Sequence, residues 1–364
     1  MDIIVTGRSA LKLHRIARRK WPILSLHSMP MDTVDAGALD RRWLRSLNLE
    51  AFRNLGMFSQ ENPLDLCITH AKGRTRIPEI VNHVRSIPLP GGSYLEIHPS
   101  RSSIDEFPIR SECRIVVDSV PLTIAMIASE LHESVRCNRM TRQTAIMRLI
   151  PLICEFCGTY THDPLNPKGE IEYNVAPASD VSEVRTYLKK LHGLRGIDIA
   201  RAAANYAADL LASPMEFVVY AVLTFPPRMG GIHLCGIRVN EALSISDRRL
   251  KELGIMRLTP DFRINDWKLA IEYNGSEHLE KYRVRQDNTR AQNYVLLGYR
   301  YFPIMIDDIR PISALDRTLY RLADVLSEYG GKKLRRRIRE IICNEKYHAA
   351  RMELLRLYLP TVNT

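Results

Sequence analysis

The 364-residue sequence contains no run of 18 apolar residues, and its first residues lack the apolar stretch of a secretory signal. A helix that crosses a membrane needs about 20 mostly apolar residues, and a signal peptide needs an apolar segment of its own. We therefore expect a soluble, cytoplasmic protein without a membrane partner. The chain is long enough for two domains that each bury a core.

Cysteine is scarce and follows no pattern, with seven residues at irregular spacing. An odd count without an export signal indicates reduced thiols rather than a disulfide framework. Cys154 and Cys157 form one Cys-x-x-Cys pair, and no second pair with zinc-ribbon spacing follows. A structural zinc needs four ligands, and His162 and Cys137 are near enough in sequence to complete such a site. The alternative is a buried pair of thiols at the end of an apolar helix.

Acidic residues are fewer than basic ones, 41 against 52, which leaves a net charge of +11. The segment 332–357 alone holds nine Lys or Arg and three Glu. A basic excess favours a polyanionic partner, so we expect nucleic acid, with DNA as the first candidate. A mildly basic surface without a ligand is the alternative. The basic residues expected to contact the nucleic acid are Lys332, Lys333, Arg335, Arg336 and Arg337, together with Arg290.

The first part of the chain, residues 1–158, is expected to form an α+β domain with a regulatory or nucleic-acid-binding role. Residues 159–178 lack periodicity and contain three prolines, which favours a linker. Ser9 is a plausible N-cap of the first helix. The predicted elements are a strand over 1–6, helices to about Lys20 and over 39–56, strands over 64–69, 80–87, 93–98 and 113–118, and helices over 121–132 and 141–157.

The second part is expected to form a domain over residues 179–330, followed by a basic helix over 331–364. That last helix could cap the core, bind phosphates or bind a partner helix. The predicted elements are helices over 179–192, 196–211, 214–225, 286–297 and 312–328, an edge strand over 239–245, a hairpin over 259–275, and a central strand over 299–306. Helix 286–297 should direct Asp287, Arg290 and Asn293 or Tyr294 toward the site or the DNA backbone, with Val295 and Leu296 on its buried side.

Residues 259–275 contain Asn265-Asp266 between two runs of alternating apolar residues, which predicts a β-hairpin. A turn centred on that pair places Asp261 opposite Ala270. Because side chains alternate along a strand, Asp261 and Glu272 share the polar face. Two such carboxylates raise each other's pKa unless a cation lies nearby, and a hard divalent cation is the usual solution. The alternative is the solvated outer face of a sheet.

A series of short motifs appears in a fixed order: Asp261-Phe262, Ile271 to Gly275, His278, Asp287, Arg290 and Gly298 to Arg300. This order resembles a bacterial family of unknown function with a Pro-Asp…(Asp/Glu)-x-Lys endonuclease domain, related to very-short-patch-repair endonucleases. The resemblance covers roughly residues 213–310. It implies an α/β protein, α+β overall, in which a restriction-endonuclease-like mixed sheet flanked by helices follows an N-terminal α+β domain. The N-terminal half resembles proteins related to abortive-infection antitoxins.

The resemblance also implies phosphodiester hydrolysis by a water that Mg²⁺ or Mn²⁺ activates. Asp261 and Glu272 would hold the cation, with the backbone carbonyl of Tyr273 and with Glu216. His278 would accept the proton of the water. Glu216 has a competing local role, because it lies at the third helical position of a capping box that Ser213 opens.

One position departs from the nuclease pattern. Asn274 lies where many such nucleases carry Lys and where much of this family carries Asp. An amide can bind a metal or orient water, but it cannot supply positive charge to the reacting phosphate. Two functions therefore stay open: an endonuclease, or a non-catalytic nucleic-acid-binding regulator or antitoxin-like protein on the same scaffold. Either could bind a protein partner through the N-terminal domain.

Overall fold

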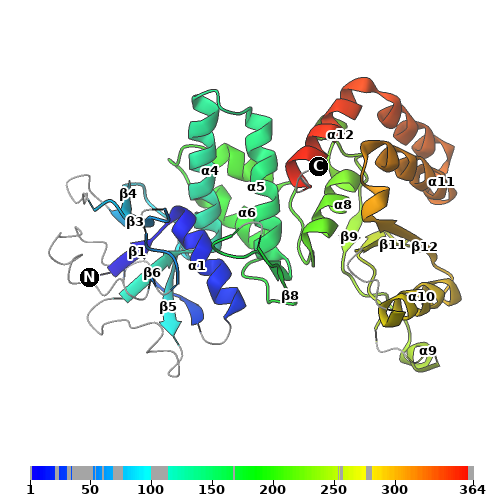
Figure 1. Ribbon diagram of the computed structural model, residues 1–364, viewed down its shortest axis with the longest axis horizontal. Coiled ribbons are helices and arrows are strands. Elements are labelled where there is room, and N and C mark those ends of the chain that lie inside the picture. The colour runs from blue at the N-terminus through cyan, green and yellow to red at the C-terminus, as the bar shows by residue number, and fades with distance from the viewer. Residues whose placement is uncertain are drawn as a thin grey trace. The chain divides into compact units, whose positions relative to one another are not determined.

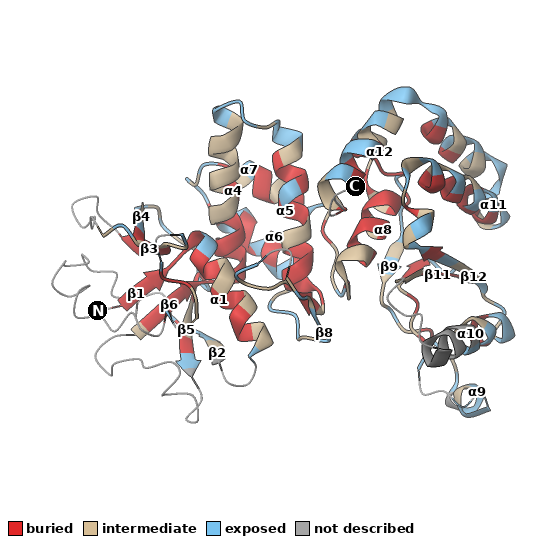
Figure 2. Cartoon of the chain, viewed as in Figure 1, coloured by how far each residue is buried: buried red, intermediate tan, exposed pale blue. Residues whose placement is uncertain are grey.

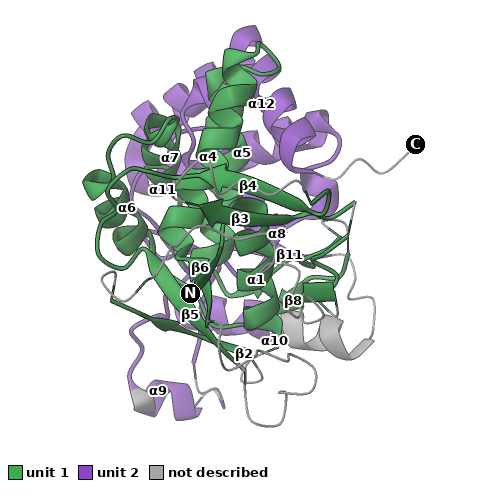
Figure 3. Cartoon of the chain, turned by 90° about the vertical axis from the view of Figure 1, so that its left-hand side faces the viewer, with its two compact units in different colours: residues 1–209 green, residues 210–364 purple. Residues whose placement is uncertain are grey.

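The computed structural model describes residues 2–20, 24–30, 34, 52–53, 55–59, 61–68, 77–99, 114–166, 169–252, 254, 257–275 and 281–359. The chain divides into two compact units, residues 1–209 and 210–364 (Figures 1 and 3). Each unit combines helices with sheets, so the expected mixed α and β class is confirmed. Within the described ranges, every helix is too short or too polar to cross a membrane.

Unit 1 is built on a six-stranded sheet with the order β2-β5-β6-β1-β3-β4. β1 runs parallel to β6 and antiparallel to β3, and β3 runs parallel to β4. The central strands are continuous apolar runs because the sheet is covered on both faces. The strands are β1 (Asp2–Val5), β2 (Leu24–Ser28), β3 (Leu64–Ile68), β4 (Ile80–Val84), β5 (Tyr94–Pro99) and β6 (Arg114–Asp118).

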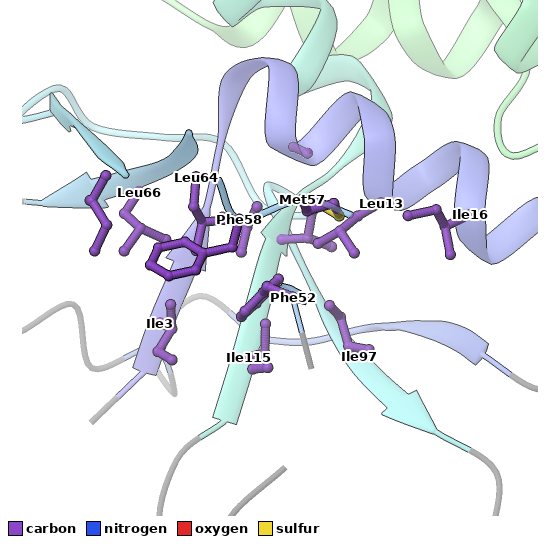
Figure 4. Packing of buried hydrophobic residues seen from close by; sticks show 14 of the residues in the cluster. Ile3, Leu13, Ile16, Phe52, Met57, Phe58, Leu64, Leu66, Ile97 and Ile115 are labelled. Atoms are coloured by element: carbon purple, nitrogen blue, oxygen red, sulfur yellow. The ribbon is translucent and has the colours of Figure 1, made fainter. Parts of the chain in front are cut away.

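Helix α1 (Gly7–Arg19) covers part of this sheet, and its apolar side forms the core of unit 1. Figure 4 shows Leu13 and Ile16 of α1 on one side, strand residues on the other, and Phe52 between them. Ser9 is not the N-cap as expected, because the helix already begins at Gly7. Ser9 instead donates its backbone N–H to Asp65 on β3, at 3.1 Å. The helix predicted over 39–56 lies mostly outside the described residues.

The described part of unit 1 contains four more helices: α4 (Val120–Arg136), α5 (Arg142–Cys157), α6 (Val181–Lys190) and α7 (Ile197–Ala204). Since α6 and α7 pack on α4 and α5, the division between the units falls after Asp209, about 30 residues beyond the expected linker. The segment 159–178 carries the short strands β7 (Tyr160–Thr161) and β8 (Glu172–Tyr173). Polar contacts attach it to α1: Arg18 donates to the carbonyl of Ala176, and to that of Gly158 just before the segment.

Unit 2 is built on a four-stranded sheet with the order β12-β11-β10-β9. Its strands are β9 (Ile237–Val239), β10 (Phe262–Ile264), β11 (Leu269–Asn274) and β12 (Arg300–Met305). β9, β10 and β11 are antiparallel neighbours, and β12 runs parallel to β11. β12 is thus an edge strand in the described sheet and not a central one. Pro303, which has no N–H to donate, suits that edge position.

The helices of unit 2 are α8 (Pro214–Thr224), the 3-10 helix η4 (Pro227–Met229), α9 (Asp247–Glu252), α10 (Lys281–Leu296), the 3-10 helix η5 (Ile306–Asp308), α11 (Ile312–Cys343) and α12 (Glu345–Tyr358). α8 and α11 cover one face of the sheet, where Val219 and Leu319 lie beside Ile304. α10 covers the other face, where Tyr294 packs with Ala270. Figure 2 shows buried residues gathered in α8 and the strands, and exposed ones along α11 and α12.

Two expectations about these helices are wrong. Val295 and Leu296 are 65% and 59% exposed, because α10 turns Asn293 and Tyr294 toward the sheet instead. The basic C-terminal segment is not one helix: α11 is kinked at Gly331, whose φ of 73° is not helical, and α12 follows as a separate helix. Glycine is needed at position 331 because a positive φ strains any side chain with a Cβ.

Candidate functional site

The hairpin of β10 and β11 forms with a longer loop than the sequence predicts. Phe262 pairs with Ile271 and not with Leu269. Asn265 and Asp266 do occupy the turn, which the Trp267 N–H closes by donating to the Ile264 carbonyl at 3.0 Å. The next residues stay outside the ladder, since Trp267 stacks on Tyr329 of α11 with ring centroids 5.3 Å apart.

This change of register moves the pairing by two residues, so it does not exchange the two faces of the strands. Asp261 and Glu272 remain on one face, as the alternation predicts. Continuing the ladder from Phe262 and Ile271 places these two carboxylates directly opposite each other rather than diagonally. The other face is apolar: Phe262 and Ile271 are fully buried there.

A third carboxylate, Glu216, comes from the first turn of α8 and joins this pair electrostatically. Burial, followed by the charges of Glu216 and Glu272, raises the pKa of Asp261 well above its usual range. Burial and the charge of Glu272 likewise raise the pKa of Glu216. Glu216 and Glu272 are only 8% and 4% exposed. Three acidic groups from separate elements thus share one buried environment.

Glu216 is held by groups outside its helix. Its Oε2 atom accepts hydrogen bonds from the Ala212 N–H at 2.9 Å and from the Asn240 amide at 2.8 Å. Ser213 caps α8 by accepting from the Glu216 N–H at 3.0 Å. Only this half of the expected capping box forms, because the Glu216 side chain is directed to Ala212 and Asn240. The Glu216 carboxylate therefore binds Ala212 and Asn240, and its charge acts on the other carboxylates of the cluster.

Glu272 is paired with a cation that the protein itself supplies. Arg290 of α10 contacts Glu272 Oε1 through Nε at 2.8 Å and through Nη2 at 2.7 Å. Tyr294, one turn further on, donates its hydroxyl to the same oxygen at 2.6 Å. Burial and the charge of Glu272 raise the pKa of this phenol. Arg290 also donates to the carbonyl of Thr259 at 2.5 Å, which fixes its guanidinium beside the carboxylates.

Of the remaining expected site residues, Tyr273 contacts the acidic cluster, whereas Asn274 is directed to the neighbouring strand. Tyr273 donates its backbone N–H to Asp261 Oδ2 at 2.7 Å. Asn274, half-buried at the end of β11, donates its amide to the Tyr301 hydroxyl at 3.0 Å. His278 lies outside the described residues. The structure therefore brings Glu216, Asp261 and Glu272 together with Arg290, and it directs Asn274 toward β12.

The chemistry of the cluster fits a hard divalent cation, because carboxylate oxygens are its preferred ligands and the cluster holds more negative than positive charge. Protein groups nevertheless already bind one of these carboxylates, because Arg290 and Tyr294 both contact Glu272. In the described part of the chain, no three His, Cys, Asp or Glu side chains are arranged to hold a metal ion. A cation that binds Glu272 at Oε1 has to displace Arg290 from that oxygen.

Two further residues lie in this region that the sequence motifs did not indicate. Asn240 follows β9 with a positive φ of 47°, donates its N–H to the backbone carbonyl of Asp261 and donates its side-chain amide to Glu216. Arg263 lies in β10, only 8% exposed, and its Nε atom is buried without a hydrogen-bond partner among the described residues. The sequence does indicate the position of Arg263: it lies two residues after Asp261, so the two side chains share one face of the strand.

The basic residues near the C-terminus are only partly available to a ligand. Arg335 contacts Asp324 at 2.5 Å, Arg336 contacts Glu340 at 3.3 Å, and Arg337 donates to the carbonyl of His233 at 3.1 Å. Lys332 and Lys333 are exposed on α11. These two lysines are the positions best placed to meet a phosphate from solvent.

Cys154 and Cys157 lie at the end of α5, and both are buried. Burial raises the pKa of Cys154 to about 12 and raises that of Cys157 as well. A zinc ligand must be a thiolate, so this environment favours two neutral thiols. The other zinc candidates lie in different surroundings: Cys137 is exposed beside Glu133, and burial lowers the pKa of His162.

No protein-family model, curated protein or solved structure matches this chain.

Proposed function

We propose that residues 210–364 form a metal-dependent, endonuclease-like domain that hydrolyses phosphodiester bonds in DNA. The observation that carries this proposal is the convergence of Glu216, Asp261 and Glu272 from three separate elements. Their burial and mutual charge raise the pKa of Asp261 and of Glu216. A divalent cation would relieve this accumulation of negative charge. The antiparallel strands, the parallel edge strand and the flanking helices agree with a restriction-endonuclease-like sheet.

In this proposal, Asp261 and Glu272 hold Mg²⁺ or Mn²⁺, and Glu216 and the backbone carbonyl of Tyr273 complete the oxygen ligands. Such a cation lowers the pKa of a bound water and neutralises charge on the phosphate. His278 would accept the proton of the attacking water. Arg290 would release Glu272 and remain close enough to contact the DNA backbone.

The other partners follow from charge and from the two-unit organisation. Lys332, Lys333 and the neighbouring Arg335, Arg336 and Arg337 would contact DNA phosphates away from the site. Unit 1 would bind a protein partner or regulate unit 2, in keeping with the resemblance to antitoxin-related proteins. The cytoplasm is the compartment in which such a protein would meet DNA in a bacterium.

A second function, a non-catalytic nucleic-acid-binding regulator or antitoxin-like protein, is favoured by Arg290. The guanidinium already neutralises Glu272, so the folded protein does not depend on a metal to hold that carboxylate. Asn274 agrees with this alternative, because its amide is directed to Tyr301 and carries no positive charge.

Titration of the full-length protein with Mg²⁺ and with Mn²⁺, followed by calorimetry, separates the two functions. We expect the natural protein to bind one of these cations. Asp261→Asn and Glu272→Gln should each abolish binding, because the remaining charge is too small to displace the water around the cation. Arg290→Gln should tighten binding by removing the competing cation. Asp266→Asn, in the exposed turn of the same hairpin, is the matched control and should bind as the natural protein does.

Cleavage assays complete this experiment with single-stranded, duplex and mismatched DNA. Glu272→Gln should abolish cleavage, whereas Asn274→Lys should increase it by placing a positive charge beside the phosphate. If neither the natural protein nor Arg290→Gln binds either cation, and neither cleaves DNA, the enzyme proposal is wrong and the regulator remains.

A further inference from the structure

Arg263 is a buried cation that the fold of unit 2 does not explain. It lies in the middle of β10, it is 8% exposed, and its Nε atom has no hydrogen-bond partner among the described residues. A buried donor atom without a hydrogen-bond partner destabilises the folded state, because it has lost its hydrogen bonds to water. Buried arginines are therefore normally paired, as Arg351 of the same unit is with Asp316.

The neighbour of Arg263 across the sheet increases this cost. Arg263 pairs directly with Arg238 on β9, and like charges opposite each other on one face repel. Among the described residues, Arg238 contacts Glu241 at 3.3 Å and Asp266 at 3.9 Å. Two guanidinium groups are thus adjacent on one face of the sheet, and an anion bound between them would relieve their mutual repulsion.

The position of Arg263 relative to the acidic cluster indicates which anion. Residues two apart in a strand lie on the same face, about 7 Å apart, so Arg263 shares the face of Asp261. The ladder that places Asp261 opposite Glu272 places Arg263 opposite Ala270. A cationic side chain thus lies one step along the sheet from the carboxylates, on the face that carries them.

We propose that Arg263 binds a phosphate group of the nucleic acid beside the carboxylate cluster and supplies the positive charge that Asn274 lacks. The guanidinium suits this ligand because its planar donors match two phosphate oxygens. Arg238, across the strand, adds a second positive charge to the same phosphate position. The inference rests on the proposed function in assigning the phosphate to a nucleic acid, but the anion site itself needs neither metal nor cleavage.

Thermal unfolding of the full-length protein in inorganic phosphate, at constant ionic strength, tests the anion site directly. We expect phosphate to raise the Tm of the natural protein and to leave that of Arg263→Gln unchanged. Without phosphate, Arg263→Gln should unfold at a higher temperature than the natural protein, since it removes the buried Nε donor that has no partner. Arg248→Gln, an exposed arginine of α9, is the control and should respond to phosphate as the natural protein does.

Arg263→Lys keeps the charge without the planar donors and should show a smaller response to phosphate. An equal phosphate response in the natural protein and the Arg263 variants, or no response in the natural protein, would overturn the proposal. A loss of stability in Arg263→Gln without phosphate would overturn it too, because Arg263 would then have a purely structural role.

Binding of a labelled DNA duplex, measured by fluorescence anisotropy in EDTA, tests the assignment to a nucleic acid. Arg263→Gln should lower the affinity about ten-fold, the size of one charged hydrogen-bonded contact, and Arg248→Gln should not. An unchanged affinity would overturn the assignment. Because EDTA removes divalent cations, this result is independent of metal binding, so a failure of the cleavage proposal and a failure of this inference give different outcomes.

Discussion

At the scale of single residues, Glu272 decides between the two functions. One oxygen of its carboxylate accepts from both Arg290 and Tyr294. A divalent cation would have to compete with a charged and a neutral donor at that oxygen. The affinity of the proposed site for a metal would therefore depend on how the contacts of Glu272 with the cation compare with its contacts to Arg290 and Tyr294, and Arg290→Gln removes one of those protein contacts.

The pH dependence of stability tests the burial of His14 in unit 1. Burial lowers its pKa from 6.5 to about 4, while Nε2 contacts the Asp118 carbonyl at 2.8 Å. The unfolded chain takes up a proton near pH 6.5 and the folded chain only near pH 4. The contribution to stability is thus fully present above pH 6.5 and is lost as the pH falls toward 4. We expect this loss to be about 3 kcal/mol.

Urea unfolding at a series of pH values measures this effect. His14→Gln should lose less stability between pH 7 and pH 4 than the natural protein, because no buried imidazole remains to resist protonation. His192→Gln, at an exposed position, is the control and should keep the natural slope. Equal slopes in His14→Gln and the natural protein would show that His14 does not titrate as described.

At the scale of elements, Arg351 attaches α12 to α11. It is fully buried, its Nε contacts Asp316 at 3.0 Å, and its Nη2 donates to the Ile342 carbonyl at 3.0 Å. We expect Arg351→Ala to lower the free energy of unfolding by about 3 kcal/mol, since it leaves Asp316 without its main partner. Denaturant unfolding measures this. Arg356→Ala, on the exposed side of α12, should change stability little.

A double variant checks the mechanism of that prediction. If the pair is the cause, Arg351→Ala with Asp316→Ala should cost less than the sum of the two single changes. Additive costs would mean that packing of the arginine stem, and not the ion pair, holds the helices together.

The basic end of α11 cannot be tested by deletion, because the segment after residue 331 contains buried core residues: Ile338, Ile341, Ile342, Leu354 and Leu355. Neutralising exposed charges is the cleaner change. The triple variant Lys332→Gln, Lys333→Gln and Arg336→Gln should make the dependence of DNA affinity on salt shallower, by up to about 3 in the slope of log K against log salt. Anisotropy titrations at several salt concentrations measure it.

The control for that experiment is a variant with the exposed pair Lys189 and Lys190 of α6 changed to Gln, which should keep the natural slope. A triple variant with an unchanged slope would contradict the assignment of α11 to DNA contact. The terminal helices would then serve the core of unit 2 alone.

At the scale of the whole molecule, the division after Asp209 predicts two independently folding parts. Residues 210–364 expressed alone should fold and keep the metal and phosphate responses of the full chain, because every residue assigned to the site lies in them. Residues 1–209 should fold and show neither response. Circular dichroism and calorimetry on both fragments measure this.

A second pair of fragments, divided between residues 178 and 179, is the matched control. It separates α6 and α7 from α4 and α5, on which they pack. The first fragment should then be less stable than residues 1–209. Equal stability of the two N-terminal fragments would place the boundary where the sequence favours it, within 159–178.

Much of the fold follows from local periodicity. The strands β3, β4, β5 and β6 and the helices α4, α5 and α8 form within a few residues of their predicted bounds. The shared face of Asp261 and Glu272 also follows from the sequence, because a strand alternates with a period of two and the register moved by two residues. These features depend on neighbours along the chain, which the sequence contains directly.

Only the tertiary structure decided the contacts between distant polar groups. Arg290 pairs with Glu272 across 18 positions, and Arg18 attaches residues 158 and 176 to α1. The edge position of β12 and the exposed side of α10 depend likewise on which elements meet. A hydrogen bond or ion pair requires two groups to approach within about 3 Å, and no local pattern specifies that approach. The sequence by itself therefore determined which residues could form the acidic site, and the packing of α10 on the sheet decided that Arg290 closes it.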